Sequence, residues 1–461
     1  MLFKDDIIYI NKQHEMKLSK VINRLLIYSL LSLILVLTSC EHVKTESLLD
    51  EKKDNYSQYL HSANIALEQD IVHDFFSPPV ASRIYLYPNL IAYEIVASKD
   101  TNYTSLTNVI HQFPKIPTYS NLQEIELAAL YSFLNVAREL VYTSKHIDLE
   151  IERLDSLFTA NPSFKTAQQY SIEVSKIIVD WLSKDKYNET RNMGEYQLLN
   201  LEDSWIPTAP DYMDALEPHW QNIRPITLDS ASQFSPESPT KYNMVEGSLF
   251  HTELMEVYEA VQTKTDSTEA IAKFWDCNPI ISRHEGHVTY SEKKLTPGGH
   301  WMNICRDACI KQNFSMMEVA HTYTSLCIGM FDAFISCWEA KYASNYIRPI
   351  TVIHNKIDPS WMPILITPNF PEYPSGHSVV SRSASTVLTS IFGDNYAFID
   401  STEAPYGMPP RSFTSFYHAS DEAAISRLYG GIHYKPAIYN GVSQGEKVGK
   451  HVISKIKKLK K

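Results

Sequence analysis

The sequence predicts an all-α protein in which helices are joined by long, ordered loops. Apolar residues recur every three or four positions over residues 122–142, 166–184, 247–262, 266–275 and 315–344, which is the spacing of amphipathic helices. Strand-like alternation is scarce. The 461-residue chain has only 14 glycines, few for an all-β protein, whereas its 24 prolines and 28 tyrosines suit helices with structured connections.

Apolar residues make up 44% of the chain, enough for one large core or for two fused ones. Long irregular segments are expected at residues 201–245, 278–301 and 349–374, but no linker separates two globular units after residue 62. We therefore expect one helical region over residues 63–461, with the chemistry in about 315–461.

The N-terminus has the features of an export signal. Lys17, Lys20 and Arg24 precede an apolar run of 13 residues, 25–37, which is shorter than the ~20 residues of a membrane-spanning helix. The sequence Leu-Thr-Ser-Cys ends at Cys40 and resembles a bacterial lipobox. The alternative is a signal anchor followed by a chance cysteine.

A lipidated Cys40 would tether a soluble domain to a membrane without spanning it, which predicts an exported lipoprotein in the periplasm or on the cell surface. Residues 1–39 would be the signal peptide, and the polar segment 40–62 a flexible tether. The formal charge of the chain is −11, and without residues 1–39 it is 37 − 50 = −13. Such an acidic chain is a poor candidate for nucleic acid, so any anion site must be local.

Five cysteines follow Cys40, an odd number that excludes a complete set of disulfides. No two of them have Cys-x-x-Cys spacing, so a zinc ribbon is not expected. We expect small core residues at Cys277, Cys305, Cys309, Cys327 and Cys337.

The clearest helix, at about residues 315–344, has an apolar stripe that leads to a lysine. The stripe consists of Met316, Val319, Tyr323, Leu326, Met330, Phe334 and Trp338. Lys341 is the next residue in this row. A lysine on the buried face is costly without an anion beside it, although a lysine at a helix end can also extend to solvent.

Three segments in the last third of the chain form one chemical set. They are Lys341 with Arg348, Pro374-Ser375-Gly376-His377, and Arg427 with His433. Lysine and arginine supply positive charge, and guanidinium groups match the oxygens of a tetrahedral anion. Ser375 is a suitable N-cap for a helix whose free N–H groups would face the anion, and Gly376 permits close approach of the backbone.

In order and spacing, these segments resemble the three signature motifs of the superfamily that joins vanadium-dependent haloperoxidases to type 2 phosphatidic acid phosphatases. The resemblance covers about residues 200–461. It implies an all-α fold of two packed helical bundles, with the site in the C-terminal bundle. It also implies that vanadate or phosphate is bound by Lys341, Arg348, Ser375, Gly376 and Arg427.

The resemblance implies roles for two histidines. In the haloperoxidases, the residue matching His433 coordinates vanadium, and the residue matching His377 handles a peroxide proton. In the phosphatases, the same positions hold the nucleophile and the acid that protonates the leaving alcohol. One geometry serves both because five-coordinate vanadate resembles the transition state of phosphoryl transfer.

Two aromatic residues favour the peroxidase. Trp338 resembles the tryptophan that lines the vanadate pocket of haloperoxidases, and Phe370 resembles a phenylalanine of chloroperoxidases where bromoperoxidases have histidine. Both would also suit a core or a loop anchor. The segment around Phe370 is similar to bacterial iodoperoxidase-like members. Roughly 300 residues precede Lys341, more than a compact phosphatase needs.

The superfamily usually has an aspartate four residues after the last histidine, and here that position is Ala437. In a phosphatase this carboxylate would activate the nucleophile, so its loss argues against phosphohistidine chemistry. Asp276 and Asp332 are candidates to replace it. His300 follows a Gly-Gly pair and is expected in a loop, with a position at the pocket entrance as the alternative.

We therefore expect a haloperoxidase that holds vanadate and oxidises a halide, iodide foremost, with hydrogen peroxide that Lys341 polarises. The first alternative is an acid phosphatase that cleaves a phosphate ester with a histidine nucleophile. The second is a non-catalytic lipoprotein with a degenerate anion pocket. Membrane contact is expected only through the lipid anchor, and the sequence predicts no particular oligomeric state.

Overall fold

The computed structural model describes residues 56–119, 122, 124–285 and 287–461. The predicted signal peptide, Cys40 and most of the predicted tether lie outside these residues. Residues 57–461 form one compact unit. Helix α2 (Tyr56–His73) already includes residues 56–62, which the sequence places in the tether. Within the described part of the chain, no helix is both long enough and apolar enough to cross a membrane.

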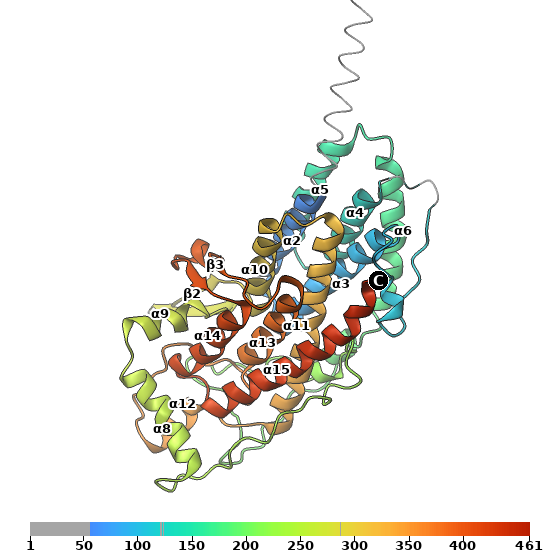
Figure 1. The fold of residues 1–461 in the computed structure, drawn as a ribbon. Helices are drawn as coiled ribbons and strands as arrows, with labels where there is room; N and C mark the ends of the chain where they lie inside the picture. The colour runs from blue at the N-terminus through green and yellow to red at the C-terminus, as the bar shows by residue number, and fades with distance from the viewer. Residues whose placement is uncertain (1–55, 120–121, 123, 286) are drawn as a thin grey trace, which may run out of the picture. The chain divides into compact units, whose positions relative to one another are not determined.

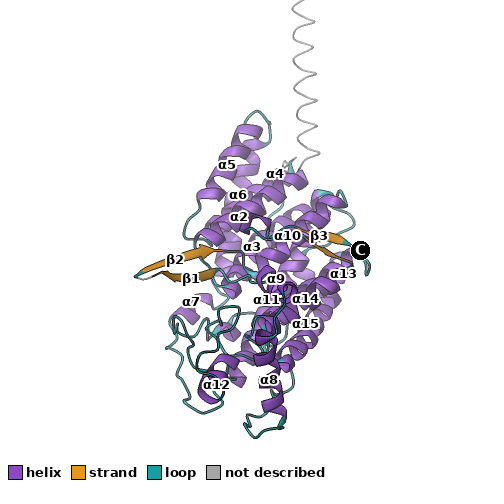
Figure 2. Cartoon of the chain, turned by 90° about the vertical axis from the view of Figure 1, so that its left-hand side faces the viewer, coloured by secondary structure: helices purple, strands orange, loops and turns teal. Residues whose placement is uncertain are grey.

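The unit is predominantly helical, which confirms the predicted fold class (Figures 1 and 2). The first helices after α2 are α3 (Pro78–Ala97), α4 (Ile125–Arg138), α5 (Lys145–Phe158), α6 (Phe164–Leu182) and α7 (Tyr187–Arg191). They are followed by α8 (Leu249–Gln262), α9 (Asp266–Phe274), α10 (Pro297–Lys311), α11 (Met316–Ser344), α12 (Pro349–Lys356), α13 (Gly376–Phe392), α14 (Phe416–Tyr429) and α15 (Lys435–Ile456).

The remaining elements are short. Four 3-10 turns occur at Leu106–Asn108, Trp220–Asn222, Ala404–Tyr406 and Lys457–Leu459. Two antiparallel pairs of strands are β1 (Ile280–Glu285) with β2 (Val288–Lys293), and β3 (Phe398–Asp400) with β4 (Arg411–Phe413). Figure 2 shows that the β1–β2 hairpin extends away from the helices.

Helix α11 runs through the core. The Ser315 side chain accepts a hydrogen bond from the Glu318 N–H, and the Glu318 side chain accepts from the Ser315 N–H, so a capping box begins the helix. Every member of the predicted apolar stripe is buried. Helix α11 packs against both α3 and α13. Because the stripe is buried along its length, the last turn of the helix brings Lys341 into the interior.

A row of three glycines brings α15 close to α13. A Cβ atom on Gly441, Gly445 or Gly449 would lie less than 3.0 Å from an atom of α13, closer than real Cβ contacts occur. Glycine inside a helix costs about 1 kcal/mol relative to alanine, so the close packing must offset this cost at three positions. The row fixes the position of α13, whose first turn carries one of the three sequence motifs.

Two loop predictions are wrong. The segment 278–301 contains the β1–β2 hairpin and the first turn of α10, and the segment 349–374 begins with α12. The Thr296 side chain caps α10 by accepting from the Gly299 N–H at 3.1 Å, and Pro297 fits the first turn. His300 therefore lies in a helix rather than in a loop, and its side chain is fully buried.

Candidate oxyanion site

Lys341 lies in the last turn of α11, and its side chain is completely buried. Its Nζ donates to the carbonyl oxygens of Pro371 (3.0 Å), Glu372 (3.1 Å) and Pro374 (2.5 Å). Burial lowers the pKa of Lys341 to about 7. All three N–H donors of the ammonium group are thus used on one loop. Lys341 does not extend to solvent; it ties this loop to α11 and places a charge beneath it.

Arg348 is the N-cap residue of α12 and is also fully buried. Its Nε donates to the Phe370 carbonyl at 3.0 Å, and its Nη1 donates to the Ile432 carbonyl at 2.9 Å. Nη1 also lies 3.4 Å from Nε2 of His433. The second terminal nitrogen, Nη2, has no hydrogen-bond partner among the described residues. A buried donor left unpaired costs about 1–3 kcal/mol, so Nη2 marks a ligand position.

The motif Ser375-Gly376-His377 begins α13, as predicted. The Ser375 side chain accepts from the Ser378 N–H at 3.4 Å, while the Ser375 N–H donates to the carbonyl of Ala437 at 3.0 Å. The N–H groups of Gly376 and His377 lie in the first turn, where a helix leaves such donors without an intrahelical partner. A Cβ at Gly376 would make only ordinary contacts of 3.6 and 3.8 Å. Packing alone therefore does not require glycine here, and any close approach would be to a ligand.

His377 points one ring nitrogen into the site. Its Nε2 is buried and has no partner in the described structure, while the ring is hydrogen-bonded to the backbone of Trp275. Burial lowers the pKa of His377 well below its usual range, and the nearby Arg427 acts in the same direction. The imidazole is thus neutral at ambient pH. If its other nitrogen donates to Trp275, Nε2 carries a lone pair that can accept a proton.

Arg427 lies in the last turn of α14 and is buried. Its Nη2 donates to the carbonyls of Trp275 (2.7 Å) and Ala272 (3.3 Å), and its Nε donates to the Ser426 hydroxyl at 2.9 Å. Burial lowers the pKa of Arg427, and the carboxylate of Asp276 opposes this shift. The backbone around Trp275 therefore anchors both Arg427 and His377.

His433 is held by a carboxylate that the sequence analysis did not identify. Its Nδ1 lies 2.7 Å from Oε1 of Glu372, and both side chains are buried. The Tyr434 N–H donates to the same oxygen at 3.0 Å, which marks Oε1 as an acceptor. We therefore assign the proton to Nδ1, and the lone pair of Nε2 then faces Nη1 of Arg348 at 3.4 Å. Burial raises the pKa of Glu372 to about 8, while Arg348 and Lys341 oppose this effect.

The two aspartates named as candidates to replace the missing carboxylate at Ala437 have other partners, and Glu372 is the carboxylate that contacts His433. Asp332 accepts hydrogen bonds from the N–H groups of Ile226 and Thr227, both at 2.8 Å. Asp276 lies near Arg427 and 4.0 Å from Nζ of Lys294. Glu372 instead comes from a proline-rich loop 61 residues before His433.

These residues surround a cavity of about 150 Å³. From the predicted set, the residues that line it are Trp338, Phe370, Gly376, His377, Arg427 and His433. Lys341, Arg348 and Ser375 lie behind this lining. The Phe370 ring lies 4.8 Å from Nζ of Lys341 and 5.1 Å from the Arg348 guanidinium, and 5.0 Å from the Trp338 ring. An aromatic wall thus covers two buried cations.

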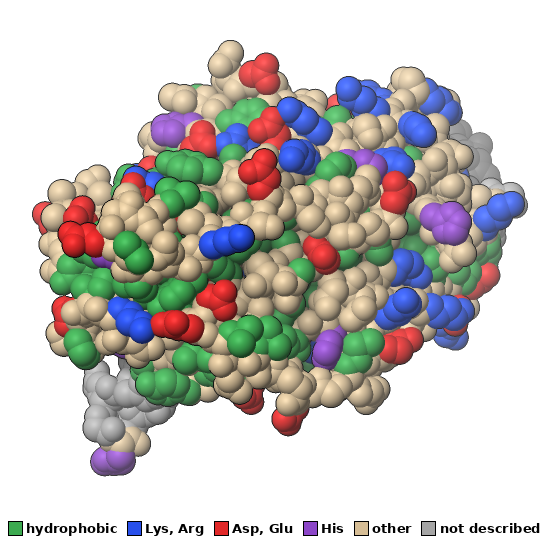
Figure 3. All heavy atoms as spheres, turned by 90° about the horizontal axis from the view of Figure 1, so that it is seen from below, with side chains coloured by type: hydrophobic (Ala, Val, Ile, Leu, Met, Phe, Trp, Pro, Cys, Tyr) green, Lys and Arg blue, Asp and Glu red, His purple; other side chains and the backbone are tan. Residues whose placement is uncertain are grey.

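The positive charge of the site is internal. The face seen in Figure 3 carries both acidic and basic side chains, with the basic ones more frequent towards the right of the view. The three cations of the site are instead at most 2% exposed. In an acidic protein, an anion is therefore attracted by a local field that acts at short range and in low dielectric. The arrangement is consistent with the expectation that any anion site is local.

Comparison with known proteins identifies the family. A family model described as the VCPO second helical-bundle domain matches residues 321–461. The structure of a bacterial vanadium-dependent iodoperoxidase is 44% identical over 87% of this chain and 96% of that one, with a TM-score of 0.82. The chain belongs to the vanadium-dependent haloperoxidases.

More distant members of the family share the fold. Holo and apo structures of a bacterial vanadium-dependent chloroperoxidase are each 15% identical, with TM-scores of 0.66 and 0.65. Each covers 83% of this chain, and 93% and 94% of the chloroperoxidase chains. No curated protein sequence matches the chain. The match over most of the chain means that the haloperoxidase fold includes the N-terminal helices, where the sequence offered only helical periodicity.

Proposed function

We propose that the protein is a vanadium-dependent haloperoxidase that oxidises halide ions, iodide foremost, with hydrogen peroxide. The observation that carries this proposal is the setting of His433. Glu372 holds Nδ1 at 2.7 Å, Nε2 lies 3.4 Å from the Arg348 guanidinium, and His433 lines the same cavity as His377. The 44% identity to a bacterial iodoperoxidase supports the preference for iodide.

The residues present fit vanadate. A tetrahedral oxyanion requires several N–H donors, and the buried Nη2 of Arg348 and the first-turn N–H groups of α13 are available to it. A vanadium atom requires one nitrogen lone pair, which Nε2 of His433 offers. Bound vanadate supplies a Lewis acid that activates peroxide without changing its own oxidation state. Arg427 would balance the remaining negative charge.

His377 is suited to proton transfer. His377 lines the cavity, and its buried Nε2 has no hydrogen-bond partner among the described residues, so the neutral ring can accept a proton from incoming hydrogen peroxide. The protonated ring then returns that proton to the oxygen that leaves as water. The proposed role of Lys341 is narrower than the sequence suggests, since its three donors hold the loop 371–374. Lys341 acts on the bound group mainly through its charge.

The cavity wall supports a preference for iodide. The lining includes Phe334, Trp338 and Phe370, together with Pro368. An apolar wall penalises a small, strongly hydrated halide more than a large, polarisable one, because the solvation free energy of an ion falls as its radius rises. Iodide is therefore expected to enter this cavity with the smallest desolvation cost.

One observation favours a second function for the same site. The absence of an aspartate at position 437 argued against a phosphatase, but Glu372 supplies His433 with a buried carboxylate. A histidine oriented in this way can attack phosphorus, and His377 can protonate the leaving alcohol. Cleavage of phosphate esters by the vanadate-free protein is thus the competing hypothesis.

The test is to reconstitute the full chain with vanadate and measure peroxide-dependent oxidation of iodide, bromide and chloride in turn. We expect the highest kcat/KM for iodide, and the loss of both vanadate binding and oxidation in His433→Ala. His251→Ala, a half-buried histidine of α8, is the control. Brisk hydrolysis of an aryl phosphate by the vanadate-free protein, with no halide oxidation after reconstitution, would establish the phosphatase instead.

We also propose that the chain is exported and that lipidation at Cys40 anchors it to a membrane. The basic residues, the short apolar run and the lipobox-like sequence before Cys40 support this proposal. Radiolabelled palmitate should be incorporated into the wild-type protein in bacterial cells, and Cys40→Ser should abolish both the label and the membrane fraction. Release of unlabelled wild-type protein into the soluble fraction would contradict the anchor.

A further inference from the structure

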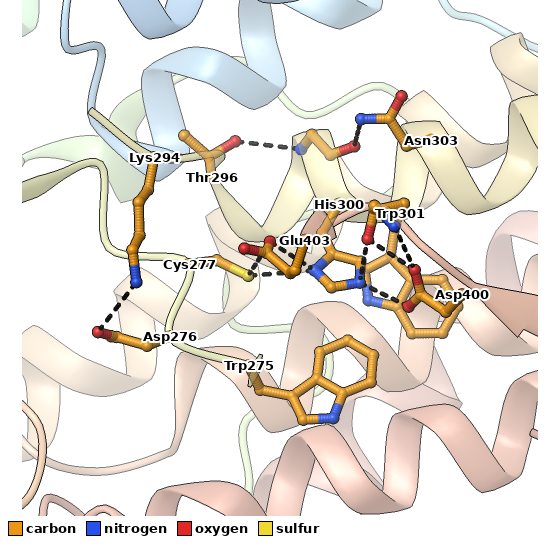
Figure 4. Close-up of polar contacts among 12 residues, drawn as sticks. Trp275, Asp276, Cys277, Lys294, Thr296, His300, Trp301, Asn303, Asp400 and Glu403 are labelled. Atoms are coloured by element: carbon orange, nitrogen blue, oxygen red, sulfur yellow. Dashed lines mark hydrogen bonds and ion pairs between the residues drawn. The ribbon is translucent and has the colours of Figure 1, made fainter. Parts of the chain in front are cut away.

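Figure 4 shows a second buried cluster, and one of its members, Cys277, also lines the oxyanion cavity. The Cys277 Sγ is 3.4 Å from Nδ1 of His300, and this nitrogen is 3.2 Å from Oε1 of Glu403. The third distance, from Cys277 Sγ to Glu403 Oε1, is 4.0 Å. All three side chains are buried. Among the described residues, these three side chains form a group in which the possible metal-ligand atoms all lie within 4.8 Å of one another.

The outer nitrogen of His300 is held by a second carboxylate. Its Nε2 lies 2.7 Å from Oδ2 of Asp400 and 2.8 Å from the hydroxyl of Thr402. Thr402 in turn donates to Asp400 at 2.6 Å, and Trp275 stacks on the imidazole with a centroid distance of 4.6 Å. Asp400 fixes Nε2 as a protonated nitrogen and, against the effect of burial, raises the pKa of His300 well above its usual range, so a metal ion that binds Nδ1 would displace a proton from that nitrogen. Metal-binding histidines usually have such a partner on the outer nitrogen.

We propose that Cys277, His300 and Glu403 bind one divalent transition-metal ion, with zinc the best match. A thiolate, an imidazole nitrogen and one carboxylate oxygen form a ligand set of intermediate softness, which suits zinc and disfavours calcium or magnesium. The expected charge also fits, because a thiolate and a carboxylate together neutralise a divalent cation inside the protein.

The distances agree with tetrahedral coordination. With zinc–ligand bonds of about 2.0–2.3 Å, pairs of ligand atoms should be about 3.4–3.6 Å apart. The observed separations of 3.2, 3.4 and 4.0 Å depart from these values by a few tenths of an ångström, so small side-chain rotations suffice. Cys277 also lines the neighbouring cavity, through which an ion and a water ligand for the fourth position can enter.

The ion would serve as a clamp between three segments that are far apart in the sequence. Cys277 follows α9, His300 lies in the first turn of α10, and Glu403 comes after β3. The backbone just before Cys277 is the part that holds Arg427 and His377 of the oxyanion site, through the Trp275 carbonyl and peptide. Metal binding therefore stabilises the wall of the oxyanion cavity, and it does so whatever reaction that cavity performs.

The competing explanation is a metal-free network in which the same groups only share hydrogen bonds. That arrangement buries two carboxylates around one imidazole, and the Cys277 thiol contributes only a weak donor. The metal content of the purified full chain distinguishes the two. After expression in zinc-containing medium and extensive dialysis, we expect about one zinc per chain, measured by plasma mass spectrometry.

Two variants test the ligands. Cys277→Ser and Glu403→Gln change little in volume and should lower the zinc content at least tenfold, while Cys309→Ser, another buried cysteine in α10, should leave it unchanged. Metal-free wild-type protein given cobalt(II) should develop a thiolate-to-cobalt charge-transfer band, and its melting temperature should rise. This measurement does not require that either variant fold.

The inference is overturned if wild-type protein retains no zinc and takes up neither zinc nor cobalt from solution. It is equally overturned if a folded Cys277→Ser or Glu403→Gln variant binds as much metal as the wild type. His433→Ala provides the link to the oxyanion site: it should keep its zinc while losing vanadate. A protein that oxidises iodide but never contains zinc would refute the clamp and leave the proposed function intact.

Discussion

Removal of the Glu372 carboxylate should weaken vanadate binding without unfolding the protein. In Glu372→Ala, the imidazole of His433 loses its 2.7 Å partner and the Tyr434 N–H loses an acceptor at 3.0 Å. The loss of a hydrogen-bonded partner behind a metal ligand typically lowers affinity about 10- to 100-fold. We therefore expect the Kd for vanadate to rise by about that factor.

The conservative variant separates orientation from charge. Glu372→Gln keeps an oxygen that can accept from Nδ1 of His433, so it should bind vanadate more tightly than Glu372→Ala but less tightly than wild type. Vanadate binding is measured by equilibrium dialysis and by recovery of iodide oxidation, with circular dichroism to establish folding. Glu256→Ala, which removes a half-exposed partner of Lys435, is the matched control. A folded Glu372→Ala protein whose Kd lies within twofold of wild type would refute the reasoning.

Three further predictions concern stability. Gly445→Ala should lower the free energy of unfolding by about 1–3 kcal/mol, because the new methyl group overlaps a backbone carbonyl of α13. Gly194→Ala is the control, since the space around Gly194 is open. Equal effects of the two variants in urea denaturation would contradict the close packing of α15 against α13. Asp70→Ala should lower the free energy of unfolding by about 2–4 kcal/mol, since the buried Asp70 carboxylate accepts from two N–H groups at the start of α5. Asp180→Ala, which removes one member of an exposed ion pair, should change it by less than about 1 kcal/mol. Burial lowers the pKa of His61 to about 4, below its unfolded value of 6.5. The stability that this shift contributes is therefore fully present above pH 6.5, and about 3 kcal/mol of it is lost as the pH falls toward 4. His61→Gln should flatten the pH dependence of the free energy of unfolding over that window, and an unchanged slope would show that His61 does not titrate in this way.

Local patterns in the sequence predicted the elements that depend on local physics. The apolar row of α11 is buried from end to end, and the predicted stripe leads to a lysine in the interior. Ser375 caps α13 where a Pro-Ser-Gly sequence suggested a helix start. Each of these predictions rests on neighbours within one or two turns, for which spacing and capping rules suffice.

The misses involve contacts between distant segments. Glu372 contacts His433 because the proline-rich loop lies beside the segment that follows α14, and helical periodicity does not predict a contact between segments so far apart in the sequence. The sequence nevertheless contained a signal for this carboxylate. Glu372, between Pro371 and Tyr373, is an unusual residue in an apolar segment that lies between two motifs. His300 was misplaced for a different, local reason: the Gly-Gly pair suggested a turn, whereas the Thr296 cap and Pro297 begin a helix.

Because of the row of glycines on α15, the walls of the oxyanion cavity differ in how readily their residues can be substituted. The wall formed by the start of α13 is locked, because side chains larger than hydrogen on α15 would displace it. Another wall, the loop around Phe370, is held by its backbone carbonyls, which accept from Lys341 and Arg348, and such bonds do not depend on the loop's own side chains. Natural variation and laboratory evolution of halide preference should therefore accumulate in the loop, while substitutions along α13 and α15 are removed by selection for folding.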